Sequence, residues 1–166
     1  MLEIHLPDDP STRALGRALA RALTVAAGAN AGGVLCLSGH LGAGKTTLVK
    51  GLVAGRGLAA EKDVTSPTFL RLVRYEDGAS APLVHVDAYR MHGEGDVFEL
   101  GLDEDLAGGA LVVLEWPENI AAAIPADHLR VGLDHLGATG RRARLSAGGP
   151  ESALWLTNLD LSLVQA

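Results

Sequence analysis

The 166-residue sequence has no apolar run that approaches the length of a membrane-spanning helix, which argues against a membrane protein. It has one cysteine, Cys36, which excludes an intramolecular disulfide and is predicted to be a small core residue. The first residues lack the basic and apolar regions of a signal peptide. These absences together predict a cytoplasmic protein.

Basic residues are scarce as well. The chain has 14 Lys and Arg against 20 Asp and Glu, a net charge of −6, and its only lysines are Lys45, Lys50 and Lys62. A protein that grips a nucleic-acid backbone by itself is usually basic or carries a basic face. The composition therefore argues against a stand-alone nucleic-acid binder.

The chain has the length and apolar content of one domain with a hydrophobic core, and we expect a single domain over residues 1–166. Apolar and alternating patterns predict strands at 2–6, 34–37, 70–75, 82–87 and 110–115, and a hairpin over 128–133 and 141–145. Helices are predicted from an Asp9 N-cap to Gly28 and Asn30, from about residue 44, and over 117–123. Residues 146–166 remain unassigned. This order predicts an α/β fold whose sheet is mostly parallel, with antiparallel hairpin additions and helices on both faces.

One motif dominates the sequence. Residues 39–46 read GHLGAGKT, which fits G-x-x-x-x-G-K-[ST] at every fixed position. Glycines allow the backbone to turn with positive φ and to approach a polyphosphate closely. In this pattern Lys45 reaches the phosphates, and the Thr46 hydroxyl is placed to bind Mg²⁺.

The flanks of this motif have the expected character. The apolar run at 34–37 is typical of a buried strand, and Leu48, Val49, Leu52 and Val53 recur at helical spacing after it. The alternative is a glycine-rich turn that binds nothing. A strand before the motif and a helix after it favour the P-loop of a nucleotide-binding protein.

Two apolar strands each end in an acid, Asp87 and Glu115. Ligands of α/β folds bind outside the carboxyl ends of strands, so both acids can face the nucleotide. Either acid can serve Mg²⁺ while the other orients the attacking water. The alternative for Glu115 is a cap on the next helix, because Pro117 follows it.

Three further clusters are candidates for function. Residues 85–90, HVDAYR, gather four polar side chains at a strand end, where Arg90 would neutralise phosphate or pair with an acid. The hydroxyl-rich segment 65–68 is either a loop that senses a γ-phosphate or an ordinary turn. In the basic run 141–144, alternation places Arg142 and Arg144 on one face and Arg141 on the other, and a solvated hairpin is the simpler interpretation.

Five motifs in this order resemble those of the bacterial TsaE family. They are GxLGAGKTT from residue 39, TSPTF at 65–69, HxDxYR at 85–90, ELG at 99–101 and EWP at 115–117. The resemblance extends over about residues 8–145. A Walker-type loop alone is weak evidence for any one family, whereas the ordered set is specific.

The resemblance implies a P-loop ATPase required for threonylcarbamoyladenosine (t6A) formation at position 37 of tRNAs that read codons starting with A. Such proteins are weak ATPases alone and are stimulated by two partners, TsaB and TsaD, which handle the tRNA. This chain would then meet tRNA only indirectly. ATP and Mg²⁺ are the implied cofactors.

Roles implied by the resemblance fall on matching positions. Lys45 holds phosphates, Thr46 and Glu115 bind Mg²⁺, and Asp87 supports hydrolysis. The implied nucleotide contacts are Gly39, His40, Leu41, Gly42, Ala43, Gly44, Lys45, Thr46, Thr47, Thr12 and Arg141. Two features depart from the family pattern: His40 stands where an aspartate is frequent, and the tail beyond residue 145 matches no motif.

Other functions remain as alternatives. A small-molecule kinase would need a lid with arginines, and segment 91–109 is short and acidic. A GTPase would need an Asn-Lys-x-Asp base reader, and residues 157–160, TNLD, lack the lysine. A nucleotide-gated binding module with little turnover differs from the ATPase only in whether hydrolysis has a role.

Overall fold

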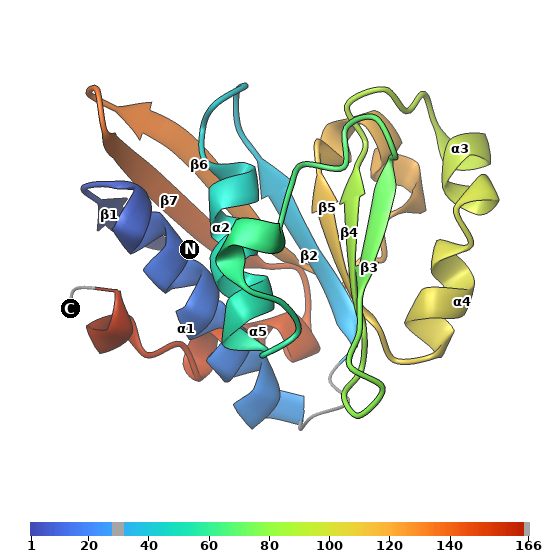
Figure 1. Ribbon diagram of the computed structural model, residues 1–166, viewed down its shortest axis with the longest axis horizontal. Helices are drawn as coiled ribbons and strands as arrows, with labels where there is room; N and C mark the ends of the chain where they lie inside the picture. Colours follow the sequence, from blue (N-terminus) through green and yellow to red (C-terminus); the bar gives the residue numbers. More distant parts are fainter. Residues whose placement is uncertain (28–31, 165–166) are drawn as a thin grey trace.

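The structure is a computed structural model that describes residues 1–27 and 32–164 (Figure 1). Its strands are β1 (Leu2–Leu6), β2 (Gly33–Ser38), β3 (Leu72–Tyr75), β4 (Leu83–Asp87), β5 (Leu111–Glu115), β6 (Leu129–Leu136) and β7 (Gly140–Ala147). Its α-helices are α1 (Asp9–Ala27), α2 (Lys45–Gly55), α3 (Glu94–Glu99), α4 (Leu102–Ala107) and α5 (Pro150–Thr157). Its 3₁₀-helices are η1 (Glu61–Asp63), η2 (Pro117–Ala123) and η3 (Leu161–Leu163).

These seven strands form one sheet in the order β1-β7-β6-β2-β5-β4-β3. The four central strands β6, β2, β5 and β4 are parallel to one another. The outer pairs β1–β7, β7–β6 and β3–β4 are antiparallel. The expected α/β architecture, with a parallel centre and antiparallel hairpin additions, is confirmed.

Helices lie on both faces of the sheet, as predicted (Figure 1). Alternate residues of β2 explain this: Leu35 and Leu37 join the core beneath α1, α2 and α5, whereas Val34 and Cys36 join the core beneath α4 and η2. Burial raises the pKa of the Cys36 thiol to about 12, which agrees with its predicted role as a small core residue. In the described part of the chain, no helix is long and apolar enough to cross a membrane.

Helices α1 and α2 touch backbone to backbone. A Cβ added to Gly51 would lie 2.0 Å from the carbonyl oxygen of Arg13, and one added to Gly16 would lie 2.2 Å from that of Leu48. Only glycine allows this approach. The contact places the start of α1 beside the start of α2.

Two local predictions were wrong in detail. Asp8 caps α1 instead of Asp9: its carboxylate accepts the Ser11 backbone N–H at 2.8 Å, one residue earlier than predicted. The segment after Pro117 is a 3₁₀-helix with a kink at Ile120, where φ is −132°. Gly28 and Asn30, predicted to end the first helix, lie outside the described residues.

The unassigned tail is part of the fold. β7 extends to Ala147, and α5 follows at residue 150. Trp155 of α5 is 3% exposed, and its ring would be only 2.6 Å from a Cβ on Gly33. The tail therefore completes the core on the α1 side of the sheet.

Candidate functional site

The glycine-rich loop, residues 39–44, joins β2 to α2 as the sequence predicts. Its glycines have positive φ, 143° at Gly39, 76° at Gly42 and 103° at Gly44. A Cβ on Gly39 would also lie 2.4 Å from the carbonyl oxygen of Leu133. The first N–H groups of α2 have no partner within the helix, so this end offers donors and a positive dipole end to an anion.

Lys45 opens α2 and is only 5% exposed. Its Nζ donates to the carbonyl oxygens of Gly39 at 2.7 Å and His40 at 3.1 Å. The same atom lies 3.9 Å from the centroid of the Trp116 ring. Burial lowers the pKa of Lys45, while the nearby negative charge of Glu115 acts in the opposite direction.

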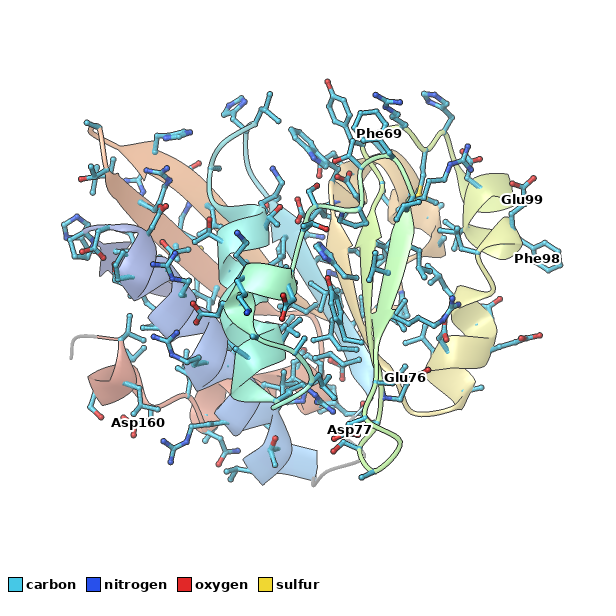
Figure 2. The ribbon with its side chains drawn as sticks, viewed as in Figure 1. Phe69, Glu76, Asp77, Phe98, Glu99 and Asp160 are labelled. Atoms are coloured by element: carbon cyan, nitrogen blue, oxygen red, sulfur yellow. The ribbon has the colours of Figure 1, made fainter. Side chains whose placement is uncertain are left out.

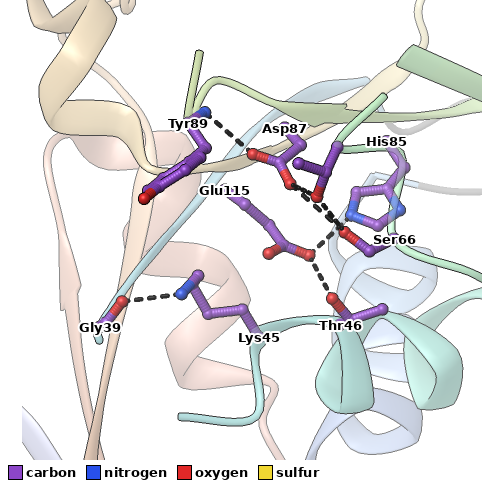
Figure 3. Close-up of polar contacts among 9 residues, drawn as sticks. Gly39, Lys45, Thr46, Ser66, His85, Asp87, Tyr89 and Glu115 are labelled. Carbon is purple, nitrogen blue, oxygen red and sulfur yellow. Dashed lines mark hydrogen bonds and ion pairs between the residues drawn. The ribbon is translucent and has the colours of Figure 1, made fainter. Parts of the chain in front are cut away.

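Asp87 and Glu115 are adjacent in the sheet, because β4 and β5 pair in parallel with these two residues in register. Glu115 is 3% exposed, and its Oε1 accepts the Thr46 hydroxyl at 2.9 Å. His85 Nε2 lies 2.9 Å from the same oxygen (Figure 3). Within residues 1–27 and 32–164 no side chain caps η2, so the interpretation of Glu115 as a helix cap is wrong.

Asp87 ties the hydroxyl-rich segment to the sheet. Its Oδ2 accepts the hydroxyl of Thr68 at 2.6 Å and that of Ser66 at 3.3 Å. Its Oδ1 accepts the backbone N–H of Tyr89 at 2.9 Å. The carboxylate is thus held from both sides (Figure 3), and segment 65–68 is more than an isolated turn.

Two apolar side chains next to this segment point outward. Phe69 is 84% exposed and Leu70 is 74% exposed. Figure 2 shows Phe69 at the opposite end of the β3–β4 hairpin from Glu76 and Asp77.

The guanidinium carbon of Arg90 lies 4.9 Å from the centre of the Phe69 ring. Among the described ion pairs none involves Arg90, so the predicted pairing with an acid is not observed.

A cavity of about 430 Å³ lies between the glycine-rich loop and the two strand-end acids. On one side it is lined by Leu41, Gly42, Gly44, Lys45, Thr46 and Thr47, and on the other by Ser66, Thr68, Asp87, Tyr89, Glu115 and Trp116. Its size is that of a small-molecule site. The fold therefore brings most of the predicted site residues into one hollow.

Five predicted residues do not line this cavity: Thr12, Gly39, His40, Ala43 and Arg141. Ala43 is fully buried, and His40 borders a neighbouring hollow with Asp134. Thr12 is also buried, and its hydroxyl donates to the carbonyl oxygen of Asp8 at 3.1 Å. Its methyl group faces the loop, since a Cβ on Gly44 would lie 3.6 Å from it.

Arg141 holds the glycine-rich loop from the β6–β7 hairpin. Its Nε donates to the carbonyl oxygen of Ala43 at 3.0 Å, and its Nη2 donates to that of Gly42 at 3.2 Å. Its Nη1 donates to the carbonyl oxygens of Thr139 and Gly140. The guanidinium thus links the backbone of the glycine-rich loop to the backbone of the β6–β7 turn.

The neighbouring arginines face the other way, as the alternation predicted. Arg142 Nη2 lies 3.6 Å from Asp134 Oδ2, and Arg144 pairs with the same carboxylate. The basic run therefore forms a solvated, charge-paired hairpin face on that side.

Sequence reasoning assigned no role to Trp116. Its φ is +59°, its ring lies beside Lys45, and its centroid is 5.1 Å from that of Tyr89. The only signal was the EWP motif. The partnership of His85 with Glu115 was also missed, although the polar cluster at 85–90 pointed to this strand end.

The site can also be compared with what a metal ion needs from protein side chains. Within the described residues there is no group of three or more His, Cys, Asp or Glu side chains arranged to hold a metal ion. Mg²⁺ usually keeps several waters and takes one or two protein oxygens besides phosphates. The adjacent Thr46 hydroxyl and Glu115 carboxylate are oxygens of that kind.

Comparison with known proteins gives a consistent result. The model of one family, described as "Threonylcarbamoyl adenosine biosynthesis protein TsaE", matches residues 6–143. A relative from Streptomyces coelicolor named tRNA threonylcarbamoyladenosine biosynthesis protein TsaE is 47% identical over 124 residues, covering 74% of this chain and 78% of the relative. A relative of the same name from Bacillus subtilis is 40% identical, covering 75% of each chain.

A solved structure agrees in fold. The crystal structure of Bacillus subtilis YdiB is similar with a TM-score of 0.73 and 31% sequence identity. The match covers 95% of this chain and 93% of that chain. Because the tail beyond residue 147 is longer than the uncovered part of the chain, the similarity includes at least part of that tail as well as the sheet.

Proposed function

Because this chain belongs to the TsaE family of threonylcarbamoyl adenosine biosynthesis proteins, we propose that it is the ATP-binding and ATP-hydrolysing subunit for t6A formation at tRNA position 37. Its partners in this proposal are TsaB and TsaD. The observation that carries the ATPase assignment is the cavity in which Lys45 and Thr46 face Asp87 and Glu115. The fold is then that of a P-loop NTPase.

The residues suit ATP and Mg²⁺ by their chemistry. Positive-φ glycines and the N–H groups at the start of α2 suit a polyphosphate, which needs close backbone approach. Lys45 supplies a positive charge at the same place, and Thr46 with Glu115 supplies oxygens for Mg²⁺. When bound, Mg²⁺–ATP would supply a γ-phosphoryl group whose negative charge the metal partly neutralises.

In this proposal four side chains of the cavity have separate roles. Lys45 neutralises phosphate charge, and Glu115 is held in place by its two hydrogen-bond partners. Asp87 is oriented by Ser66, Thr68 and the Tyr89 N–H, and it accepts a hydrogen bond from the attacking water. Trp116 covers one side of Lys45 and reduces its contact with water.

The charge pattern supports indirect contact with tRNA. The net charge is −6, and two arginines of the only tight basic run are paired with Asp134. A net negative charge disfavours direct binding of a phosphodiester backbone. TsaB and TsaD would therefore hold the tRNA.

The deciding experiment measures ATP hydrolysis by the purified chain, alone and with a TsaB–TsaD pair. We expect a slow rate alone and strong stimulation by the pair. A rate that ignores the pair but rises with a small acceptor molecule would indicate a kinase instead. Tight ATP binding with no turnover in either condition would indicate a nucleotide-gated binding module.

Arg141 offers a separate test of the loop. Replacing Arg141 with alanine removes two hydrogen bonds to the glycine-rich loop, so we expect ATP affinity to fall about tenfold, the value of roughly one charge-assisted hydrogen bond. Equilibrium binding of ATP measures this. Arg142→Ala is the matched control, because its partner is Asp134, and its affinity should stay near that of the parent. Equal losses in both variants would contradict the role given to Arg141.

A further inference from the structure

Two side chains converge on one oxygen of Glu115. Thr46 reaches Oε1 from α2, and His85 reaches it from β4, each at 2.9 Å. The carboxylate lines the cavity and is held by side chains of two elements, so its rotation is fixed. Its other oxygen, Oε2, takes part in neither of these two bonds (Figure 3).

His85 is fully buried, between Val73 of β3 and Val113 of β5 in the sheet register. Among the described residues Nδ1 of His85 has no hydrogen-bond partner although it is buried, so the bond from Nε2 to Glu115 is the only hydrogen bond of the ring there. Since a carboxylate only accepts, Nε2 is the donor of this bond. Burying a polar nitrogen without a partner costs free energy, and an apolar side chain would fill the same space without that cost.

We propose that His85 is a positioning residue for Mg²⁺: by holding Oε1 it leaves Oε2 of Glu115 as the oxygen available to the metal. This inference rests on the proposed function, which assigns Glu115 to Mg²⁺. Hydrogen-bond partners behind a metal ligand typically change metal affinity by 10–100-fold. His85 would therefore govern how strongly Mg²⁺ improves nucleotide binding, without touching the nucleotide.

The test is calorimetric binding of the non-hydrolysable analogue AMP-PNP to the full chain, once with saturating MgCl₂ and once with EDTA. The dissociation constant in EDTA divided by that in MgCl₂ reports how much Mg²⁺ strengthens binding. This ratio does not depend on turnover. For His85→Leu we expect this ratio to fall about tenfold while the constant in EDTA changes less than about twofold.

Two conservative variants separate positioning from packing. The amide nitrogen of His85→Gln can occupy the place of Nε2, so this variant is expected to recover most of the ratio. The shorter side chain of His85→Asn reaches only the place of Nδ1 and is expected to behave like leucine. His135→Leu is the matched control for losing an imidazole, because His135 is exposed on β6, and its ratio should equal that of the parent.

The outcomes are distinguishable. A ratio that is unchanged in both His85→Leu and His85→Asn overturns the inference, since both constants then move together, as a packing defect would make them. If circular dichroism shows that His85→Leu is unfolded, the comparison of His85→Gln with His85→Asn decides in the same way. If the parent chain binds AMP-PNP neither with MgCl₂ nor with EDTA, the proposed function itself is overturned.

Discussion

Replacing Lys45 with alanine is expected to weaken ATP binding about 100-fold and to reduce hydrolysis to background. Lys45 is the one lysine among the described residues that line the cavity, and its ammonium group also donates to the carbonyl oxygens of Gly39 and His40. The variant therefore loses both the cation for the phosphates and a clamp on the glycine-rich loop. Equilibrium binding of ATP measures the first effect, and phosphate release measures the second.

Lys50→Ala is the control for this change. Lys50 belongs to the same helix, α2, but does not line the cavity. Its removal changes the net charge by the same amount, so a general electrostatic effect would appear in both variants. Unchanged ATP affinity in Lys45→Ala would falsify the assignment of Lys45 to the phosphates.

Replacing Glu115 with glutamine is expected to lower the partner-stimulated rate of ATP hydrolysis by about 100-fold or more. Glutamine keeps the shape and still accepts hydrogen bonds from Thr46 and His85, but it removes the negative charge proposed for Mg²⁺. ATP binding in EDTA should remain near that of the parent. The measurements are stimulated phosphate release across a Mg²⁺ titration and ATP binding in EDTA.

The neighbouring acid Glu118 supplies the comparison. It is exposed on η2 and lines two neighbouring hollows but not the cavity, so Glu118→Gln should hydrolyse ATP at the parent rate. A Glu115→Ala variant with the full stimulated rate would rule out the metal role for Glu115. In that case Asp87 would become the candidate for the metal, because it is the other strand-end acid in the cavity.

The local parts of the site were predictable because their causes lie in neighbouring residues. An apolar run, a set of glycines and a helical repeat predicted β2, the glycine-rich loop and α2. Apolar runs likewise predicted the strands that end in Asp87 and Glu115. What the pattern did not specify was the exact cap of α1 or the 3₁₀ character of η2, since neighbouring residues allow both alternatives there.

The sequence by itself therefore determined where most candidate site residues lie along the chain, through backbone freedom at the glycines and the placement of acids at strand ends. Only the tertiary structure decided their partners. Thr46 meets Glu115 across 69 residues, and Arg141 meets Ala43 across 98, because β2 lies between β6 and β5 in the sheet. Strand order is a long-range property, set by how the whole core packs, and no local pattern specifies it.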